Sequence, residues 1–283
     1  MKNTLKLIGF YMNLLALVAP RYAARKGFYL FCTPVAPPVK PHHKQFFETS
    51  EMTRVTYDGT SLRLYRWGQG PKTILLIHGW QSHSFRWKNY IEALSPGEYT
   101  VYAFDAPAHG LSGGKYINIP VYSRAIEAVI EQIGPVHAIV SHSFGSFSSL
   151  YALAHRPELP IEKLVITGTP GEGMDFINFY RQLLGLNDRT MQLIRYYFVK
   201  ELGQEPEYFS AMRFAEKVQL PGLIIHDEQD EETPYRYAKL IHDRWKNSIL
   251  ITTRGLGHNL KSPDVVKYVT EFVGSTVGEA VSH

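Results

Sequence analysis

The feature that most constrains the fold of this chain is a regular alternation of short apolar runs with segments of helical periodicity, which begins near residue 52. Residues 73–78 (Thr-Ile-Leu-Leu-Ile-His) form a continuous apolar run of strand length, which is typical of a strand covered on both faces. Residues 121–133 instead repeat their apolar side chains at helical spacing. This alternation predicts an α/β fold with a mostly parallel sheet and helices on both of its faces.

The strands that we expect cover residues 52–57, 61–67, 73–78, 100–105, 136–142, 161–167, 222–227 and 248–253. The helices that we expect cover residues 85–94, 121–133, 144–155, 235–245 and 262–273. Asp58-Gly59, between the first two strands, is a dipeptide typical of a hairpin turn. With 283 residues, the chain is long enough for one large α/β domain or two small ones.

One connection, between residues 167 and 222, is much longer than the others and far exceeds what a crossover helix requires. Residues 174–214 within it hold nine Phe or Tyr, although aromatic residues make up only 13% of the chain. We expect an inserted helical subdomain, either as a small satellite core or as a lid over an apolar pocket, and both can hold together.

The first 47 residues differ from the rest in charge. They contain seven Lys or Arg and no Asp or Glu, whereas the whole chain has a formal net charge of only +4. The apolar stretch at residues 5–19 is interrupted by Asn13 and falls short of the roughly 18–20 apolar residues that cross a bilayer. Four prolines between residues 34 and 41 then predict a stiff, extended connector.

We therefore separate an N-terminal extension, residues 1–47, from a main domain, residues 48–283. The extension is either a helix docked on the domain or on a twin subunit, or an interfacial helix that brings residues 1–30 to anionic lipid. A signal peptide or uncleaved anchor is a third interpretation, although cleavage at the nearest point would leave Pro20 as the first mature residue, which is unfavourable. We expect a cytoplasmic protein, peripheral on the inner membrane face if the helix is interfacial, with a homodimer left open and no nucleic-acid partner.

A candidate nucleophile lies at residues 141–145 (Ser-His-Ser-Phe-Gly), between a predicted strand and a predicted helix. A serine on such a turn is exposed at the carboxyl edge of the sheet, at the N-terminus of the helix. The turn needs small residues two positions before and after it, because the strand and helix backbones nearly touch there. Ser141 and Gly145 meet this requirement, so Ser143 is the predicted nucleophile.

Ser143 needs two partners to react. A histidine must take the proton of the serine hydroxyl, and a carboxylate must fix the tautomer of that histidine. On a fold of this kind both follow the serine, each in a loop after a later strand. Asp230 follows the strand at 222–227, and His258 follows the last strand. Ser143, Asp230 and His258 are the predicted triad, with Asp227 as the alternative acid.

The negative oxygen that forms during acyl transfer needs two backbone N–H donors. We expect one from Phe144, the residue after the nucleophile, and one from Trp80, in the loop after the strand at 73–78. Neither a metal nor an organic cofactor is implied. The single cysteine, Cys32, excludes an internal disulfide framework and any multi-cysteine metal site.

Three motifs resemble those of the α/β-hydrolase superfamily over residues 54–273. They are His78-Gly79-Trp80, the segment 104–113 (Phe-Asp-Ala-Pro-Ala-His-Gly-Leu-Ser-Gly) and the segment 141–145. The chain is similar to the bacterial serine hydrolases of this superfamily, which are largely esterases, lipases and thioesterases. The resemblance implies a three-layer fold with an eight-stranded sheet and a helical cap at about residues 171–220.

The resemblance also implies acyl transfer through Ser143. Two residues depart from the usual pattern, because Ser141 and Ala108 stand where glycine is common. Both replacements are small, so we expect local adjustment of the backbone and not a loss of activity.

The sequence thus predicts a hydrolase of small-molecule carboxylic esters or thioesters with an apolar acyl or aryl group, acting through an acyl-enzyme. The same triad could instead cleave an amide or an activated carbon–carbon bond. Outside the enzymes, two alternatives stay open. One is a ligand-binding protein that keeps the fold without catalysis, and the other is a membrane-associated scaffold in which the N-terminal segment is the functional part.

Overall fold

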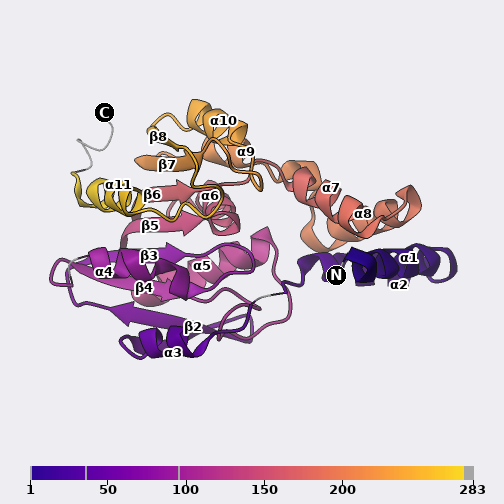
Figure 1. The fold of residues 1–283 in the computed structure, drawn as a ribbon, viewed down its shortest axis with the longest axis horizontal. Helices are drawn as coiled ribbons and strands as arrows, with labels where there is room; N and C mark the ends of the chain where they lie inside the picture. Colours follow the sequence, from indigo (N-terminus) through magenta and orange to yellow (C-terminus); the bar gives the residue numbers. More distant parts are fainter. Residues whose placement is uncertain (1, 36, 95, 277–283) are drawn as a thin grey trace. The chain divides into compact units, whose positions relative to one another are not determined.

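The computed structural model describes residues 2–35, 37–94 and 96–276 (Figure 1). The end of the main domain expected from the sequence, residues 277–283, lies outside this described part. The chain divides into two compact units. Met1–Thr33 with Glu172–Ser210 forms one, here called the helical unit, and Pro34–Gly171 with Ala211–His283 forms the other, called the sheet unit.

An eight-stranded sheet forms the centre of the sheet unit. Its strands are β1 (Glu51–Tyr57), β2 (Thr60–Trp67), β3 (Lys72–Ile77), β4 (Tyr99–Phe104), β5 (Val136–His142), β6 (Ile161–Thr167), β7 (Gly222–Asp227) and β8 (Ser248–Thr253). They lie in the order β1-β2-β4-β3-β5-β6-β7-β8. Strand β2 pairs antiparallel with β1 and β4, and the other pairs are parallel. The fold class predicted from the alternation is confirmed.

The position of each strand explains its sequence. All six residues of β7 are buried, because an inner strand of a parallel sheet is covered on both faces. The edge strand β1 is exposed over most of its length, and Val55 is its one buried residue. Continuous apolar runs therefore mark the inner strands, and polar residues mark the edge strand β1.

Helices cover both faces of the sheet (Figure 1). Helices α4 (Lys88–Ala93) and α11 (Pro263–Gly274) pack together on one face. On the opposite face α5 (Ile119–Ile133) packs beside α6 (Phe144–His155). The sheet order reverses direction between the β3–β4 and β4–β5 connections, and right-handed crossovers then place the connecting helices on opposite faces. The short α9 (Ala211–Ala215) contacts α6 and α10 (Arg236–Arg244).

Two segments of the sheet unit differ from the sequence expectation. The helix expected at 85–94 begins as a 3₁₀ turn, η1 (Ser84–Trp87), before it continues as α4. Residues 41–47, the end of the expected N-terminal extension, form helix α3 (Pro41–Phe47). Pro41 opens this helix, because a first helical residue needs no N–H and proline already has a helical φ.

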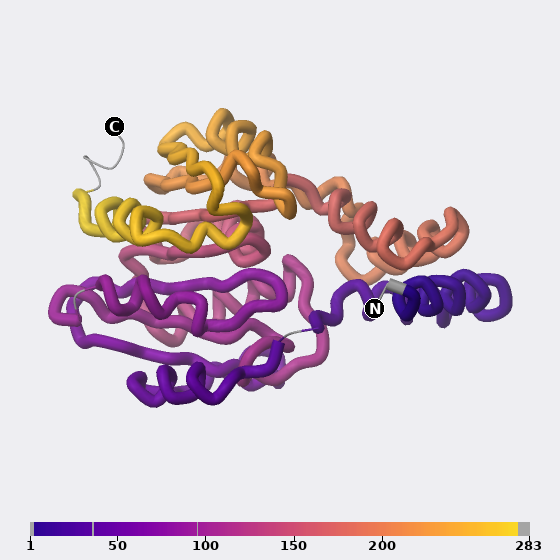
Figure 2. The backbone as a smooth tube through the Cα atoms, viewed as in Figure 1, coloured from indigo at the N-terminus to yellow at the C-terminus, as the bar shows by residue number. Residues whose placement is uncertain are grey.

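The helical unit consists of two helical hairpins from distant parts of the sequence. Its helices are α1 (Lys2–Val18), α2 (Pro20–Cys32), α7 (Gly173–Leu184) and α8 (Asp188–Leu202), followed by the 3₁₀ turn η2 (Pro206–Tyr208). The α1–α2 hairpin runs alongside the α7–α8 hairpin (Figure 2), although the whole segment Pro34–Gly171 lies between them in the sequence. The N-terminal extension thus contains three helices, of which α1 and α2 pack against the insertion and α3 belongs to the sheet unit.

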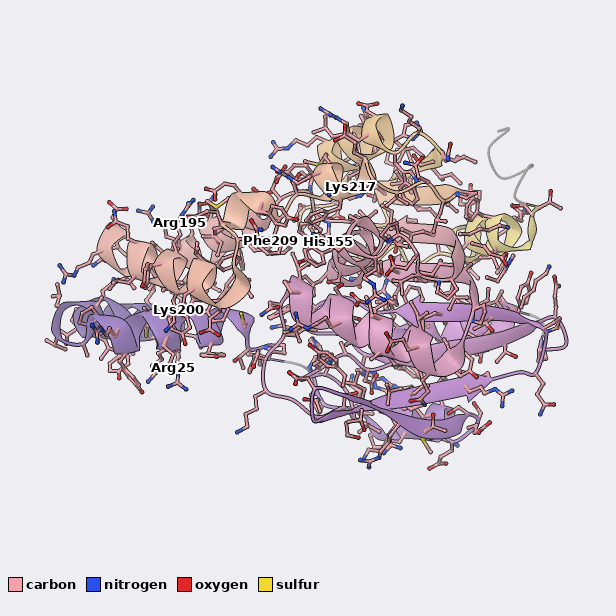
Figure 3. The ribbon with its side chains drawn as sticks, turned by 180° about the vertical axis from the view of Figure 1, so that it is seen from behind. Arg25, His155, Arg195, Lys200, Phe209 and Lys217 are labelled. Atoms are coloured by element: carbon pink, nitrogen blue, oxygen red, sulfur yellow. The ribbon has the colours of Figure 1, made fainter. Side chains whose placement is uncertain are left out.

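Aliphatic residues of both hairpins, with Met12 and Tyr180, form the buried core between them. The buried members of this core are Met12, Ala16, Ala23, Tyr180, Leu184, Leu186 and Ile194. Tyr180 packs edge-on against Phe31, with ring centroids 5.3 Å apart, and its hydroxyl donates to the Gly27 carbonyl oxygen at 3.0 Å. Phe209, labelled in Figure 3, packs edge-on against Phe198 with ring centroids 5.6 Å apart.

Asn13, which interrupts the apolar run of α1, holds the turn between α7 and α8. Its side-chain amide donates to the Gly185 carbonyl oxygen at 3.0 Å. Its Oδ1 accepts from the Asn187 backbone N–H at 3.0 Å and from the Thr190 hydroxyl at 2.9 Å. Lys6 adds a bond from Nζ to the Gln182 carbonyl oxygen. The polar residues of α1 therefore fix how the two hairpins dock.

Candidate active site

Ser143 lies on a sharp turn between β5 and α6, at the carboxyl edge of the sheet. Its backbone has φ +52° and ψ −122°, a region that non-glycine residues seldom adopt. Strain of this kind persists only where the surrounding structure holds it, and it concentrates at functional sites. The turn presents the Ser143 side chain at the N-terminus of α6, as expected for a nucleophile on a strand-to-helix turn.

Two glycines allow the backbone to close around Ser143. A Cβ on Gly145 would lie 2.4 Å from the His78 carbonyl oxygen, so α6 can start this close to β3 only with glycine there. A Cβ on Gly79 would lie 2.9 Å from the Ser143 Cβ. The His78-Gly79-Trp80 loop therefore passes directly beside Ser143.

The structure brings the three residues of the predicted triad together. The Ser143 hydroxyl lies 2.9 Å from His258 Nε2, and His258 Nδ1 lies 2.8 Å from Asp230 Oδ2. Ser143 follows β5, Asp230 follows β7 and His258 follows β8, so three loops at one edge of the sheet supply the three groups. Only 10% of the His258 side chain is exposed, and the Asp230 side chain is fully buried.

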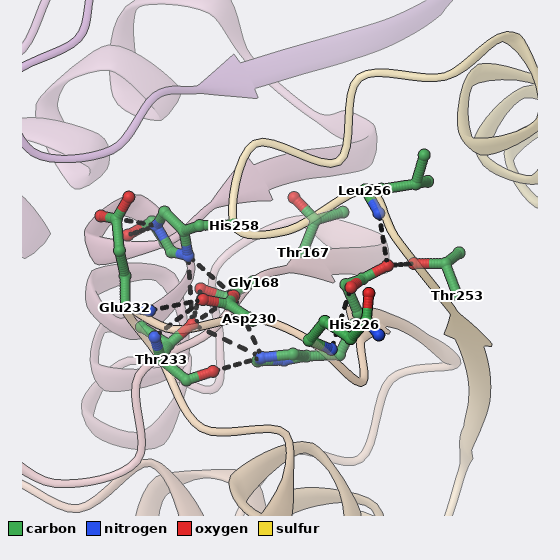
Figure 4. A network of polar contacts seen from close by, with 12 residues as sticks. Thr167, Gly168, His226, Asp230, Glu232, Thr233, Thr253, Leu256 and His258 are labelled. Atoms are coloured by element: carbon green, nitrogen blue, oxygen red, sulfur yellow. Dashed lines mark hydrogen bonds and ion pairs between the residues drawn. The ribbon is translucent and has the colours of Figure 1, made fainter.

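Asp230 is held as a carboxylate by the donors around it (Figure 4). Its Oδ1 accepts the backbone N–H groups of Glu232 and Thr233, each at 2.9 Å. Its Oδ2 accepts the Thr233 hydroxyl at 2.7 Å in addition to His258. Burial alone would raise the pKa of Asp230, but hydrogen bonds from His226, His258 and Thr233 hold that pKa well below its usual range.

Asp227, the alternative acid, is engaged elsewhere. Its Oδ2 accepts the Thr253 hydroxyl at 2.8 Å and the Leu256 backbone N–H at 2.9 Å, two donors that Figure 4 labels. Its Oδ1 accepts the Gln229 backbone N–H. These bonds tie the start of the acid loop to the end of β8. Of these two aspartates, Asp230 is thus the one in contact with His258, and the exposed Glu232 carboxylate lies 3.9 Å from the other ring nitrogen, Nε2.

Two residues that the sequence reasoning missed support Asp230. The Thr233 hydroxyl lies 3.1 Å from His258 Nδ1 as well as 2.7 Å from Asp230. His226 Nε2 lies 2.7 Å from the Thr233 carbonyl oxygen and 3.3 Å from Asp230 Oδ2, within reach of both acceptors. The available signal was spacing, because His226 and Thr233 flank Asp230 closely on either side in the sequence.

Further bonds fix the backbone that carries His258. His142 Nε2 lies 2.9 Å from the His258 carbonyl oxygen, and the Arg86 guanidinium donates to the Asn259 carbonyl oxygen at 3.2 Å. Burial lowers the pKa of His142 well below 6.5. A neutral His142 then donates its Nε2 proton to the His258 carbonyl oxygen, so the ring fixes the position of the loop that carries His258.

Trp80 and Phe144, the expected oxyanion-hole residues, adjoin each other. Their rings meet edge-on with centroids 5.5 Å apart. Phe144 is the first residue of α6, and backbone N–H groups in a first helical turn point toward the helix N-terminus. Trp80 belongs to the loop that Gly79 brings against Ser143.

The loop after β4 is organised by a buried carboxylate. Asp105 Oδ1 accepts from the backbone N–H and the hydroxyl of Ser84. Its Oδ2 accepts from the Tyr65 hydroxyl at 2.9 Å and the Leu111 N–H at 2.8 Å. Ala108 in this loop has φ +64°, which is the adjustment expected where alanine replaces glycine.

The histidines near Ser143 do not join a metal-binding cluster among the described residues. Within 2–35, 37–94 and 96–276, no three His, Cys, Asp or Glu side chains gather closely enough to hold a metal ion. The two ring nitrogens of His78 bond to the backbone of Gly79 and Ala106. Burial lowers the pKa of His78 well below 6.5, so the ring is a neutral packing group.

Comparison with known proteins finds one family over most of the chain. The model of the alpha/beta hydrolase family matches residues 74–266. An uncharacterized hydrolase of Bacillus subtilis, YugF, is 24% identical over 271 residues, covering 79% of this chain and 98% of that protein. A pimeloyl-[acyl-carrier protein] methyl ester esterase of Nitrosospira multiformis is 31% identical over 118 residues, 38% of this chain and 42% of its own length.

A solved structure of Est1E from Butyrivibrio proteoclasticus with ferulic acid bound has a TM-score of 0.61 and 21% sequence identity. The match covers 82% of this chain and all of that one, and at this identity it bears on the fold alone. The family match covers well over half of the residues. This chain therefore belongs to the α/β hydrolase family.

Proposed function

We propose that this chain is a serine hydrolase that cleaves carboxylic esters or thioesters with an apolar acyl or aryl group. The observation that carries the proposal is the continuous chain of contacts from the Ser143 hydroxyl through His258 to Asp230, at 2.9 and 2.8 Å. Both distances lie in the hydrogen-bond range expected of a nucleophile, its base and the group that orients the base.

In the first half of the reaction, Ser143 Oγ attacks the carbonyl carbon of the substrate while His258 Nε2 takes the hydroxyl proton. The proton on His258 Nδ1 stays shared with Asp230, which stabilises the imidazolium that forms. The tetrahedral intermediate then collapses. His258 returns its proton to the leaving alkoxide or thiolate, and the acyl group remains on Ser143.

In the second half, water attacks the acyl-enzyme and gives a proton to the same nitrogen of His258. Collapse of the second tetrahedral intermediate releases the carboxylic acid and restores the Ser143 hydroxyl. In both halves the backbone N–H groups of Trp80 and Phe144 donate to the oxyanion, and loss of one such donor typically costs about 10²–10³ in rate.

Two observations support the substrate class. The aromatic rings of Trp80 and Phe144 adjoin each other beside the nucleophile, which favours an apolar group over a charged one. The name of the Nitrosospira relative is that of a methyl ester esterase, and a solved neighbour is named as a thioesterase domain from the curacin pathway. Both chemistries pass through the acyl-enzyme proposed here.

The test is the intact mass of the protein after exposure to a fluorophosphonate, which labels only an activated serine. We expect one adduct on the wild type, none on Ser143→Ala, and one on the control Ser149→Ala. Ser149 lies on the same helix, and its hydroxyl donates to the Gly145 carbonyl oxygen. Hydrolysis of p-nitrophenyl esters and acyl-CoAs by the same three proteins then compares esters with thioesters.

Two results would overturn the proposal. One is labelling that persists in Ser143→Ala, which would place the reactive serine elsewhere. The other is a folded wild type that stays unlabelled with and without detergent, which would favour a ligand-binding protein without catalysis.

A further inference from the structure

The outer side of α1 carries an apolar surface that the described structure leaves uncovered. Its members recur every three or four residues, so they share one side of the helix. They are Leu7, Phe10, Tyr11, Leu14, Leu17 and Val18, with exposed fractions between 45% and 74%. These six residues are called the α1 stripe below.

The other side of α1 is fully packed. Met12 and Ala16 are completely buried against the α7–α8 hairpin and α2, and Asn13 is bonded to the α7–α8 turn. Helix α1 is thus apolar on two opposite sides, of which one faces the core of the helical unit. A helix apolar all round is normally buried, so the α1 stripe marks a surface that functions in contact with a partner.

Helix α2 carries exposed cations, of which Lys26 adjoins the stripe and Arg25 lies over the ring of Tyr29 on α2 itself. Arg21, Arg25 and Lys26 are exposed on α2, and Figure 3 labels Arg25 there. Lys26 Nζ lies 4.9 Å from the ring centroid of Tyr11, a member of the stripe, and 5.6 Å from that of Tyr22. Among the described residues, no ion pair joins these three cations to a carboxylate.

The sequence around the stripe adds no negative charge. Residues 1–47 contain no Asp or Glu, so α1 and α2 present apolar and basic side chains without an acidic one. Tyr11 and Tyr22 are about half exposed. Tyrosine combines an apolar ring with a polar hydroxyl and is enriched where membrane meets water.

The charge distinguishes between two partners. A second copy of the chain, docked by twofold symmetry, would bring the same patch of each subunit together and would place the α2 cations of one copy near those of the other. An anionic lipid surface instead offers hydrocarbon for the stripe and negative headgroups for the cations. Both features of the patch are matched only in the second case.

We propose that the α1 stripe is a membrane-docking surface that lies in the interface of an anionic bilayer, with Arg21, Arg25 and Lys26 at the lipid headgroups. The packed side of α1 keeps the helix parallel to the membrane. At about 1.5 Å rise per residue, Leu7 to Val18 forms a contact roughly 17 Å long. The helical unit thereby anchors the protein on the membrane through one side of a single helix.

The first experiment is flotation of the full-length protein with vesicles of phosphatidylcholine alone or mixed with phosphatidylglycerol. We expect binding to the mixed vesicles and weak binding to the neutral ones. Phe10→Ser with Leu14→Ser should lower the bound fraction by about tenfold or more, because the stripe loses two large apolar side chains near its middle. The control is Met52→Ser with Leu240→Ser, which removes apolar residues of 44% and 45% exposure from the sheet unit.

The second experiment removes charge. Arg21→Gln, Arg25→Gln and Lys26→Gln together should abolish the preference for anionic vesicles, because each cation near the surface contributes to binding. The control variant carries three Lys→Gln substitutions at exposed positions of the sheet unit, residues 239, 246 and 267. It loses the same charge and should bind as the wild type does.

Three results would overturn the proposal: no binding of the wild type to anionic vesicles, undiminished binding of Phe10→Ser with Leu14→Ser, or a dimer in solution that the same double variant dissociates. The last result would make the stripe an interface between copies, and light scattering during gel filtration detects it. Ser143→Ala should bind vesicles as the wild type does, so the outcome is independent of hydrolase activity.

Discussion

At the scale of single residues, the site depends on a threonine as well as on the three residues of the triad. The Thr233 backbone N–H and hydroxyl each bond to one oxygen of Asp230, and the hydroxyl also lies 3.1 Å from His258 Nδ1. These contacts orient the carboxylate that orients His258. Thr233 is therefore a positioning residue for the proposed reaction.

Thr233→Val tests this role, because it keeps the shape of the side chain and removes the hydroxyl. A hydrogen bond to a charged group contributes about 1.5–3 kcal/mol, so we expect kcat for a p-nitrophenyl ester to fall about tenfold or more with KM little changed. Thr233→Ser restores the hydroxyl and should restore kcat. Equal losses in both variants, or a change confined to KM, would show that the hydroxyl has no positioning role.

The sequence predicted the part of the site that is local along the chain. Ser143 could be found because the small residues around it reveal the turn, and His258 because it follows the last strand. Thr233 and His226 could not be assigned, since their roles depend on how the acid loop folds back on itself. That folding is visible only in the contacts around Asp230.

At the scale of helices and strands, the elements that local sequence patterns define were predicted correctly, and the packing between segments distant in the sequence was not. Strands β5, β6, β7 and β8 have the bounds that their apolar runs indicate, because each run is visible in the sequence by itself. Strands β5, β6 and β7 are buried over most of their length, whereas the edge strand β8 is only partly buried. The partner of α1 and α2 could not be predicted, since it follows only after the whole segment Pro34–Gly171. Only Asn13, an isolated polar residue in an apolar helix, hinted at that partner.

Asn13→Ala tests whether this one side chain fixes the docking of the hairpins. It removes three hydrogen bonds, and the loss of one of them leaves the Thr190 hydroxyl without its acceptor. We expect the helical unit to lose about 1–3 kcal/mol of stability, measured as faster amide hydrogen exchange in α1, α2 and α8. Asn3→Ala changes an exposed residue of α1 and is the control, and matching exchange in the two variants would refute the role of Asn13.

At the scale of the whole molecule, the sheet unit buries histidines that stay neutral. Burial lowers the pKa of both His78 and His142 well below 6.5. Below pH 6.5 the unfolded chain therefore binds a proton at each position that the folded chain does not. The stability that the folded protein gains by keeping these histidines neutral is fully present above pH 6.5, and it is lost as the pH falls below 6.5.

We expect the free energy of unfolding to decrease between pH 6.5 and 5 by about 1.4 kcal/mol per pH unit for each such histidine. His142→Gln should reduce this slope by that amount, whatever its effect on stability at pH 7.5. Urea denaturation at a series of pH values measures the slope, and His42→Gln, at an exposed position, is the control. An unchanged slope in His142→Gln would contradict the assignment.

The two-part construction of the helical unit has a consequence for synthesis. Helices α1 and α2 leave the ribosome before the α7–α8 hairpin that covers them, which follows only after Pro34–Gly171 has been made. At roughly 5–20 residues per second, translation separates the two halves by about 7–28 s. During that interval the Met12 side of α1 lacks the cover of the α7–α8 hairpin, so the nascent chain presents apolar side chains on two opposite sides of this helix. The apolar surface of α1 is thus exposed to solvent and to other chains until the α7–α8 hairpin has been made.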